Sequence, residues 1–319
     1  MRQLIYATII AFIISLFLGP IILPILKKLK FGQSIREEGP QSHIKKSGTP
    51  TMGGIIIMIS VFIASILFAG QSTDLIIAMI VALGFGIIGL IDDFIKVVLK
   101  RNLGLKAYQK ILGQLIIAGI VATYAAKHPY IGTSLLIPFT TKYFDLGIAY
   151  IPITIFIVVG TANSVNLTDG LDGLAAGITL VVAAFFALAS LGLGYMGLTI
   201  FSGTIAGACL GFLRFNFYPA QVFMGDTGSM ALGGAVAALA VLTRLQLFLP
   251  IIGGIYVIET LSVIIQVVSF KMTGRRVFKM SPLHHHFELS GWHEKKVVIV
   301  FWIVGLILAL VSMLALSIH

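Results

Sequence analysis

Charged residues are scarce in this chain of 319 amino acids: Asp, Glu, Lys and Arg together make up 11% of it, against 58% hydrophobic residues. Its mean hydropathy of +1.04 lies outside the range of soluble domains. Cysteine is nearly absent as well, and the single Cys209 excludes an intramolecular disulfide, a thiolate metal site and a CxxC redox motif. The composition therefore predicts an integral membrane protein.

Apolar runs of membrane-spanning length take up most of the sequence. A spanning helix needs ~20 mostly apolar residues. The predicted spans are 3–26, 52–69, 74–91, 107–126, 148–162, 173–191, 196–213, 229–248, 250–270 and 297–318. The fold is therefore expected to be all-α, a single polytopic membrane domain over residues 1–319 with about ten transmembrane helices.

The distribution of basic residues predicts the orientation of the bundle. With ten spans, both termini share one side of the membrane. The loops on the other side are 27–51, 92–110, 163–172, 214–228 and 271–296. These five loops carry 18 of the 22 Lys and Arg residues, so the positive-inside rule makes them cytoplasmic and places both termini outside.

The net charge of +10 has two interpretations. Cytoplasmic Lys and Arg orient a membrane protein and attract anionic lipid headgroups, and some of them could also bind phosphates. Nucleic-acid binding is not expected, because the basic residues are dispersed among membrane loops. On the outside, the loop 127–147 is expected to form a small periplasmic hairpin.

Three polar islands interrupt the apolar sequence, at 92–93, 163–173 and 216–229. On insertion scales a carboxylate at the centre of the bilayer costs ~2.5–3.5 kcal/mol, so acids on membrane segments usually lie near ends or face protein. The aspartates of the islands, all on the predicted cytoplasmic side, are Asp92, Asp93, Asp169, Asp172 and Asp226. This grouping favours a site for a divalent cation and a pyrophosphate.

The first two islands also have structural interpretations. Asp92 and Asp93 end the third span, and Lys96 stands at i+4 from Asp92, as in an ordinary charged helix end. In the island 163–173, amides and carboxylates recur at three-residue intervals and suit a sugar, a base edge or metal-bound water. Asp172 could instead cap the sixth helix.

The third island, 216–229, is predicted to be an ordered loop entering the eighth span, because Pro219 and its glycines prevent a continuous helix. Asp226 near the start of that helix suits Mg²⁺, which prefers one or two carboxylates, water and substrate phosphate. Phe223 either stacks on a base or anchors the loop in the membrane.

Two polar patterns follow the third island. Glu259, Ser262 and Gln266 lie on one face of the ninth span, so that helix is expected to turn a polar stripe toward protein or water. Three consecutive histidines occupy 284–286. Adjacent residues cannot easily meet one ion, so donors to phosphate or nucleotide oxygens are favoured over a zinc site.

The chain carries five motifs of one kind of enzyme. They are Asp92-Asp93, GTPTMGG at 48–54, NLTDGLDG at 166–173, NFYPAQVFMGDTGS at 216–229 and SPLHHHFE at 281–288. Together they resemble the polyprenyl-phosphate N-acetylhexosamine-1-phosphate transferases, over essentially the whole chain. The three histidines favour the branch that handles a muramyl pentapeptide, because siblings that use N-acetylglucosamine generally lack them.

The resemblance implies a Mg²⁺-dependent transfer on the cytoplasmic face of the bacterial cytoplasmic membrane. Phospho-MurNAc-pentapeptide would pass from UDP-MurNAc-pentapeptide to undecaprenyl phosphate, giving lipid I and UMP for peptidoglycan synthesis, and so for cell shape and cell division. Asp226 would ligate the metal, while Asp92 and Asp93 would orient or deprotonate the lipid phosphate. The lipid tail would need an apolar groove by the ninth helix, where Pro250 and Gly253-Gly254 loosen the backbone.

The resemblance also implies the residues of a substrate site. The phosphates or the uridine end would meet Lys46, Thr51, Lys96 and Lys110. The nucleotide-sugar pocket would be built from Asn166, Asp169, Gly170, Leu171, Asp172, Asn216 and Gln266. Phe223 would stack on uracil, and phosphate or sugar would be read by His284, His285 and His286.

Two other functions stay open at this point. A sibling transferase for UDP-N-acetylglucosamine would share the acids, although the three histidines argue against it. A secondary transporter usually binds its substrate near the bilayer midplane and has repeat symmetry, whereas these acids gather at one interface and no repeat is visible. A single displacement is favoured over a phospho-aspartate intermediate, and a homodimer is left open.

Overall fold

The computed structural model describes residues 1–29, 46, 48–68, 70, 72–99, 101 and 104–317 of the chain. Within these ranges the chain is almost entirely helical, and its strands form one short hairpin. Most of the predicted loop 27–51 lies outside the described residues. The all-α fold that the composition predicts is confirmed.

Nine helices in the described part of the chain are long and apolar enough to cross a membrane. They are α1 (Arg2–Lys28), α4 (Thr73–Val97), α5 (Ala107–Lys127), α6 (Tyr150–Thr168), α7 (Leu174–Gly192), α8 (Met196–Asn216), α9 (Gly225–Leu242), α11 (Gly254–Thr273) and α13 (Glu294–Ser317). The apolar helix α3 (Gly54–Phe68) is shorter. The remaining short elements are η1 (Gly147–Ala149), η2 (Gln246–Phe248), α10 (Leu249–Ile252) and α12 (Leu283–Leu289).

Each of the ten predicted spans coincides with one of these helices, although some boundaries differ. Helix α4 runs to Val97, so Asp92 and Asp93 lie inside the helix and not after it. The shortest predicted span, 148–162, is longer in the structure because polar residues as far as Thr168 continue α6. Polar residues at both places are therefore presented from helices whose positions are fixed by packing.

The eighth and ninth predicted spans, 229–248 and 250–270, also differ from the helices that form. Helix α9 ends at Leu242, and Arg244 takes a φ of 65°, which a right-handed helix cannot continue. The chain turns through η2 and α10 and breaks again at Gly253 before α11 begins. The backbone of the ninth span is thus broken where Pro250 and Gly253-Gly254 were expected to loosen it.

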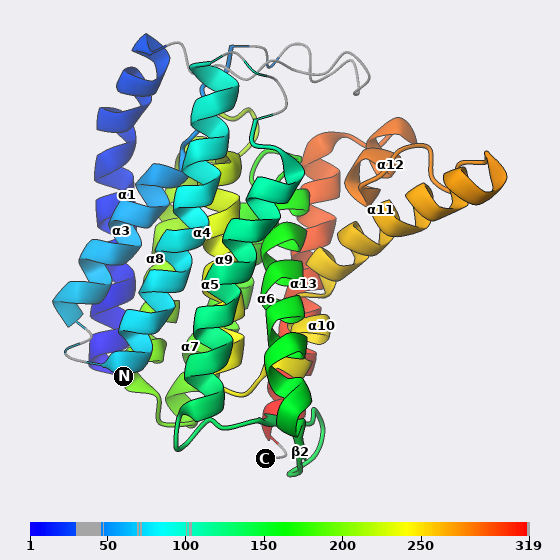
Figure 1. Cartoon of the computed structure of the whole chain (residues 1–319). Helices are drawn as coiled ribbons and strands as arrows, with labels where there is room; N and C mark the ends of the chain where they lie inside the picture. Colours follow the sequence, from blue (N-terminus) through cyan, green and yellow to red (C-terminus); the bar gives the residue numbers. More distant parts are fainter. Residues whose placement is uncertain are drawn as a thin grey trace.

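The N-terminus, the C-terminus and the hairpin lie at one end of the bundle (Figure 1), as an even number of crossings predicts. The hairpin pairs β1 (Ser134–Leu136) with β2 (Tyr143–Asp145) in antiparallel register. It confirms the hairpin predicted in the loop 127–147. Arg244 Nε donates a hydrogen bond to the carbonyl oxygen of Ser134 at 3.2 Å and so fastens the hairpin to the end of α9.

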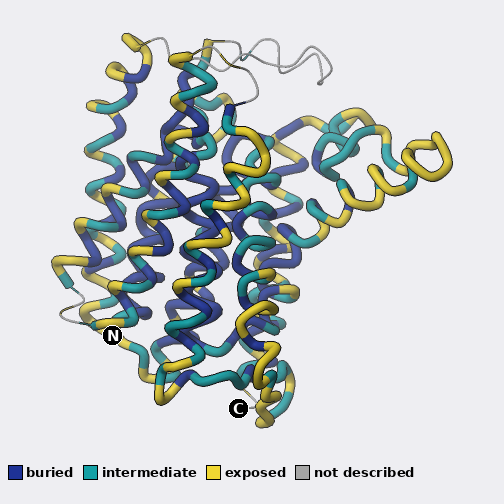
Figure 2. Tube along the Cα trace, in the orientation of Figure 1, coloured by how far each residue is buried: buried dark blue, intermediate teal, exposed yellow. Residues whose placement is uncertain are grey.

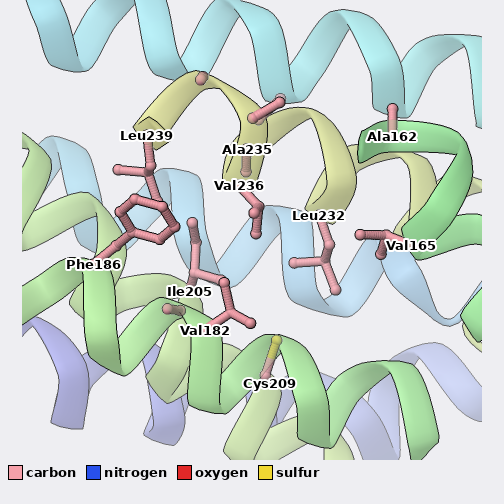
Figure 3. Packing of buried hydrophobic residues seen from close by; sticks show 14 of the residues in the cluster. Ala162, Val165, Val182, Phe186, Ile205, Cys209, Leu232, Ala235, Val236 and Leu239 are labelled. Carbon is pink, nitrogen blue, oxygen red and sulfur yellow. The ribbon is translucent and has the colours of Figure 1, made fainter. Parts of the chain in front are cut away.

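Helix α9 is the centre of the bundle. Of its apolar stretch, 89% is buried, because it is apolar all round and rich in glycine and alanine, so that α4 and α6 can pack closely on it. Its Leu232 lies near Val165 of α6, and its Leu239 near Phe186 of α7 (Figure 3). The position of α9 is therefore fixed by contacts on every side.

Helix α11 differs from the others in standing apart. It starts beside α10 and runs outward, so that its far end projects from the bundle (Figure 1). Only 22% of its apolar stretch is buried, and exposed residues recur along its length (Figure 2). Ile258, Leu261 and Ile264 are exposed, whereas Glu259 and Ser262 are buried. The polar stripe predicted for this helix therefore faces protein at these two residues.

Two glycines bring α3 and α9 into direct backbone contact. A Cβ atom at Gly54 would lie 2.2 Å from Cα of Gly228, a distance that no side chain allows. The adjoining loops pair through their backbones, since the N–H groups of Gly53 and Gly54 donate to the carbonyls of Phe223 and Met224, each at 2.9 Å. The start of α9 thus depends on glycine at this crossing.

Replacing Gly54 with Ala should therefore destabilise the fold. The new methyl group meets backbone atoms, which cannot rotate away, and overpacking of this kind costs about 1–3 kcal/mol. The measurement is the thermal unfolding midpoint in detergent. The control is Gly160→Ala in α6, where an added Cβ meets nothing within 4 Å; equal midpoints for the two variants would contradict the prediction.

Candidate active site

Three aspartates meet where α4 ends and α9 begins. Asp92 and Asp93 lie in the last turns of α4, and Asp226 lies in the first turn of α9. Each offers one carboxylate oxygen, and these three oxygens lie within 4.8 Å of one another. Asp92 and Asp93 are buried and Asp226 is partly exposed. The packing of α4 on α9 thus brings together acids that are 133 residues apart in sequence.

Two ammonium groups balance part of this charge. Lys96 Nζ lies 2.5 Å from Asp92 Oδ2 and 2.9 Å from Asp226 Oδ2. Lys110, near the start of α5, reaches Asp226 Oδ2 at 2.8 Å and Asp92 Oδ2 at 3.8 Å. The pair of Asp92 with Lys96 expected from their spacing is present, but it is one part of a network that joins three helices.

Asp93 has different partners from Asp92. Its carboxylate accepts the backbone N–H groups of Asp226 and Thr227, at 3.2 and 2.9 Å, and the Thr227 hydroxyl at 2.7 Å. These N–H groups open α9 and have no acceptor within the helix, and the helix dipole favours an anion there. Asp92 instead accepts the N–H of Leu105 at 2.8 Å. Asp93 therefore fixes the first turn of α9 and, through it, the position of Asp226.

Helix α6 adds an amide and a fourth carboxylate. Asn166 Nδ2 donates to Asp226 Oδ1 and to Ser229 Oγ, both at 2.8 Å. Asp169 follows the last residue of α6, and burial, together with the nearby charges of Asp226 and Asp93, raises its pKa to about 8. Asp169 is therefore mostly protonated at neutral pH, but the carboxylates of Asp92, Asp93 and Asp226 still outnumber the two ammonium groups, so the site carries an excess of negative charge.

This donor set fits a magnesium ion. Mg²⁺ prefers carboxylate oxygen, usually from one or two residues, and keeps water and phosphate in its other positions. One oxygen each of Asp92, Asp93 and Asp226 converge on one place, but both oxygens of Asp93 accept hydrogen bonds from the first turn of α9, whereas Oδ2 of Asp92 and of Asp226 is paired only with lysine side chains in the described residues. Asp226 and Asp92 are therefore the acids best placed to hold the ion.

A second charged cluster forms around Lys46. Its Nζ lies 2.7 Å from Asp172 Oδ1 and 2.6 Å from Glu294 Oε1. Glu294 also accepts the N–H of Asp172 at 2.8 Å, and Asp172 Oδ2 accepts the N–H of Ala220 at 2.9 Å. Gly173, not Asp172, occupies the capping position of α7. The alternative in which Asp172 caps this helix is therefore wrong, and Asp172 instead joins two loops to the start of α13.

Other residues of the expected substrate site hold the loops in place. Asn216 Oδ1 accepts the N–H of Gly173, and its Nδ2 donates to the carbonyl of Val222, each at 3.0 Å. Buried residues of this group include Thr51 and Leu171, and Phe223 is partly exposed. The loop predicted for the third island, 216–229, is ordered, and the hydrogen bonds of Asn216 join it to the loop after α6.

The three consecutive histidines have three different surroundings. His284 is completely buried. His285 Nδ1 lies 3.0 Å from a carboxylate oxygen of Glu288, and His286 Nδ1 accepts the N–H of Lys279 at 3.2 Å. The three rings therefore do not converge on one point.

The hydrogen bonds of the Gln266 side chain go to the segment after α11 and not to the aspartates. Its side-chain oxygen accepts the N–H groups of Val277 and Phe278, at 3.0 and 2.9 Å. Its side-chain nitrogen Nε2 donates to the carbonyl of Phe278 at 2.9 Å. In the described residues Gln266 thus ties the end of α11 to the segment that follows it. The polar stripe of α11 serves this contact at its far end.

Three further residues belong to these clusters and were not predicted from the sequence. Thr227 and Ser229 stand beside Asp226 in the segment GDTGS, so that motif itself could have signalled them. Glu294 precedes the last span among ordinary loop residues. No local pattern distinguishes it, because its partners Lys46 and Asp172 are 248 and 122 residues away.

Comparison with known proteins defines the class. A family model, glycosyl transferase family 4, matches residues 75–244. This stretch contains Asp92, Asp93 and Asp226, which together form the acid cluster. The chain is therefore a membrane-embedded transferase with its acids and lysines at one end of the helix bundle. A second model, phospho-N-acetylmuramoyl-pentapeptide-transferase signature 1, matches residues 46–58, which include Lys46 and Thr51.

Full-length relatives identify the particular family. The phospho-N-acetylmuramoyl-pentapeptide-transferase of Clostridium kluyveri is 57% identical over 317 residues, which are 99% of this chain and 100% of that protein. The protein of the same name from Thermoanaerobacter sp. strain X514 is 55% identical with the same coverage, and that of Alkaliphilus metalliredigens is 60% identical over 327 residues, 99% of each chain. The chain belongs to the phospho-N-acetylmuramoyl-pentapeptide-transferase family.

The contact of Asp93 with α9 predicts a loss of stability when its charge is removed. Asp93→Asn would turn an amide group toward N–H and hydroxyl donors, and leaving such buried groups unsatisfied costs about 1–3 kcal/mol. The thermal midpoint in detergent should fall, and should fall less for Thr227→Val, which removes one of the donors. The control is Asp145→Asn in the exposed hairpin. The prediction fails if Asp93→Asn unfolds at the same temperature as this control.

Proposed function

We propose that the chain transfers phospho-MurNAc-pentapeptide from UDP-MurNAc-pentapeptide to undecaprenyl phosphate, giving lipid I and UMP. The reaction takes place on the cytoplasmic face of the bacterial cytoplasmic membrane. The observation that carries the proposal is the cluster of Asp92, Asp226, Lys96 and Lys110 at one end of a membrane helix bundle. Membership of the phospho-N-acetylmuramoyl-pentapeptide-transferase family supports this choice of substrates.

The chemistry requires charge neutralisation more than covalent help. A lipid phosphate attacks a pyrophosphate, so several negative charges approach one another, and catalysis of phosphoryl transfer rests on positioning and electrostatic stabilisation. Lys96 and Lys110 are already fixed by Asp92 and Asp226. Their ammonium groups therefore offer pre-organised donors to phosphate oxygens entering this end of the bundle.

Magnesium dependence follows from the excess of carboxylates. Asp226, with Asp92 beside it, would hold the ion, which would supply positive charge to offset that of the pyrophosphate. Asn166 orients the Asp226 carboxylate by donating a hydrogen bond to it, and Ser229, which accepts a second hydrogen bond from the same amide nitrogen, holds Asn166 in place. Asp93 contributes by fixing the first turn of α9 and does not need to touch the substrate.

Asp92 is then the member of the aspartate pair that acts on the lipid phosphate. Its Oδ2 faces Lys96 and Lys110, whereas the oxygens of Asp93 accept hydrogen bonds from the first turn of α9. A phosphate monoester has a second pKa near ~6 and is mostly dianionic at neutral pH, so general-base help is modest. We therefore favour direct attack, in which Asp92 orients the incoming phosphate and takes up a proton where one remains.

The substrate's nucleotide-sugar part is assigned to the second cluster and the loops around it. Lys46 is paired with Asp172 and Glu294, whereas Lys96 and Lys110 are paired with the aspartates proposed to hold the metal, so Lys46 is assigned to the uridine end. Phe223 is partly exposed and available for stacking on a base. The polyprenyl tail takes the exposed apolar surface of α11, on the lipid side of the bundle.

The decisive experiment uses the purified chain in detergent with undecaprenyl phosphate and Mg²⁺. UDP-MurNAc-pentapeptide and UDP-N-acetylglucosamine are supplied in separate reactions, and UMP release and lipid product are measured. UMP should form from the muramyl substrate, and EDTA should abolish its formation. Asp226→Asn should lower turnover about 100-fold or more, because transition-state charge is then uncompensated.

Two outcomes would overturn the proposal. Turnover of UDP-N-acetylglucosamine alone would assign the chain to the sibling branch of transferases. If the folded protein releases UMP from neither substrate, the proposed transferase function is wrong. Full activity in EDTA would contradict the proposed metal dependence but would leave the proposed transfer reaction standing.

A second prediction separates Asp92 from substrate binding. Asp92→Asn keeps the size of the side chain but removes its charge, so the turnover number should fall far more than the affinity for UDP-MurNAc-pentapeptide. Turnover is followed by UMP release and affinity by calorimetric titration. Equal losses in both quantities would indicate that Asp92 only supports the structure.

A further inference from the structure

Helix α5 buries one polar side chain, that of Gln114. The structure describes this helix in full, and its buried residues are Gln114, Ala118, Val121, Ala122 and Ala125. They recur at helical spacing and form one face. Most of the helix looks outward, since only 28% of its apolar stretch is buried. The buried face of α5 is therefore apolar except for one amide.

This amide pairs with Asn163 of α6. Asn163 Nδ2 donates to Gln114 Oε1 at 2.7 Å, and Gln114 Nε2 donates to Asn163 Oδ1 at 3.4 Å. Asn163 Nδ2 also donates to the carbonyl oxygen of Val159, one turn earlier in α6, at 2.8 Å. The two amides thus satisfy each other inside the protein, which a membrane requires because its core offers no water.

The amide pair restricts how α5 can lie on α6. Apolar contacts alone define the register of two membrane helices weakly, because lipid tails are as apolar as the side chains that meet. A shift of α5 along α6, or a rotation about its own axis, would separate Gln114 from Asn163. Both amides would then be buried without partners, which is strongly unfavourable. The pair therefore fixes the height and the rotation of α5.

The same part of α5 carries Lys110, one turn before Gln114 and on the same side of the helix. Lys110 Nζ lies 2.8 Å from Asp226 Oδ2. On α6, Asn166 follows Asn163 by three residues and donates to Asp226 Oδ1 at 2.8 Å. Helix α6 therefore holds the first turn of α9 with one amide and holds α5 with the other.

We infer that Gln114 is a positioning residue, which through its pair with Asn163 sets the height and rotation of α5 and so places the Lys110 ammonium group against Asp226. The inference rests on the proposed function, because that function gives this ammonium group a phosphate to meet. Gln114 itself is completely buried and acts through Lys110. Two groups that meet Asp226, Asn166 and Lys110, are thereby both referred to α6.

The kinetic test replaces Gln114 with Leu, which keeps the bulk of the side chain and removes its amide. Lys110 should then lose its alignment, and a displacement of about 1 Å can cost 100-fold in rate. We expect kcat to fall about 10- to 100-fold, and the affinity for UDP-MurNAc-pentapeptide to fall less. In a Lys110→Gln background the same substitution should cost little more, because its effect passes through Lys110. If Gln114→Leu does not fold, Gln114→Asn replaces it, since the shorter amide cannot span the same gap.

The matched control is Tyr124→Phe, on the same helix. The Tyr124 hydroxyl donates to Asp74 Oδ1 of α4 at 2.8 Å, and Tyr124 lies ten residues beyond Gln114, about 15 Å further from Lys110 along the axis. Both variants remove a hydrogen bond between α5 and a neighbouring helix, so a general loosening of α5 would affect them alike. The control should match the wild type in activity.

Three kinetic outcomes would overturn the inference. The first is a Gln114→Leu enzyme with unchanged kinetics. The second is a loss in Tyr124→Phe as large as that in Gln114→Leu. The third is a full further loss when Gln114→Leu is added to Lys110→Gln, because the amide would then act by a route that does not include Lys110.

A second readout does not depend on turnover. Solid-state NMR in lipid bilayers, with ¹⁵N-labelled lysine and ¹³C-labelled aspartate, measures the proximity of Lys110 Nζ to the carboxylate carbons, and the Lys110 signal is assigned by its loss in Lys110→Gln. The proximity should weaken in Gln114→Leu and persist in Tyr124→Phe. An unchanged proximity in Gln114→Leu overturns the inference, whatever the kinetics. Absence of wild-type turnover would overturn the proposed function, while the NMR result would still decide whether Gln114 places Lys110.

Discussion

The capping of α9 by Asp93 is the interaction on which the rest of the site depends. Helix α9 is buried on all sides, and its first turn carries Asp226. N–H groups at such a helix start need acceptors, and Asp93 supplies them from α4. The same contact that completes the hydrogen bonding of α9 therefore sets where Asp226 points and which lysines it can reach.

The short loop after α6 links the features built around that contact. Asp169 stands beside the acid cluster at one end of the loop, Asp172 joins Lys46 and Glu294 at the other, and His284 packs on Gly170 between them. A nucleotide-sugar substrate that reached both clusters would lie along this loop. The groups that would contact its phosphates and its base are joined by this one loop, so their positions depend on one another.

The sequence predicts the fold class, the spans and the acids well, for physical reasons. Runs of apolar residues have few alternatives to membrane helices, and aspartates at their ends are too costly to be incidental. The exact role of Asp93 could not be predicted, because its partners on α9 are 133 and 134 residues away. Glu294 was missed for the same reason. The end of α9 was misplaced since the backbone turn at Arg244 has no glycine or proline to mark it.

The burial of nearly the whole of α9 has a mechanical consequence. Changes in bilayer thickness or lateral pressure act first on helices that contact lipid, which respond by tilting or shifting at modest cost. Helices α1, α5, α11 and α13 are largely exposed along their apolar stretches, whereas α9 is not. The Asp226 carboxylate at the start of α9 is thus shielded from the elastic state of the membrane, while α11 is free to follow it.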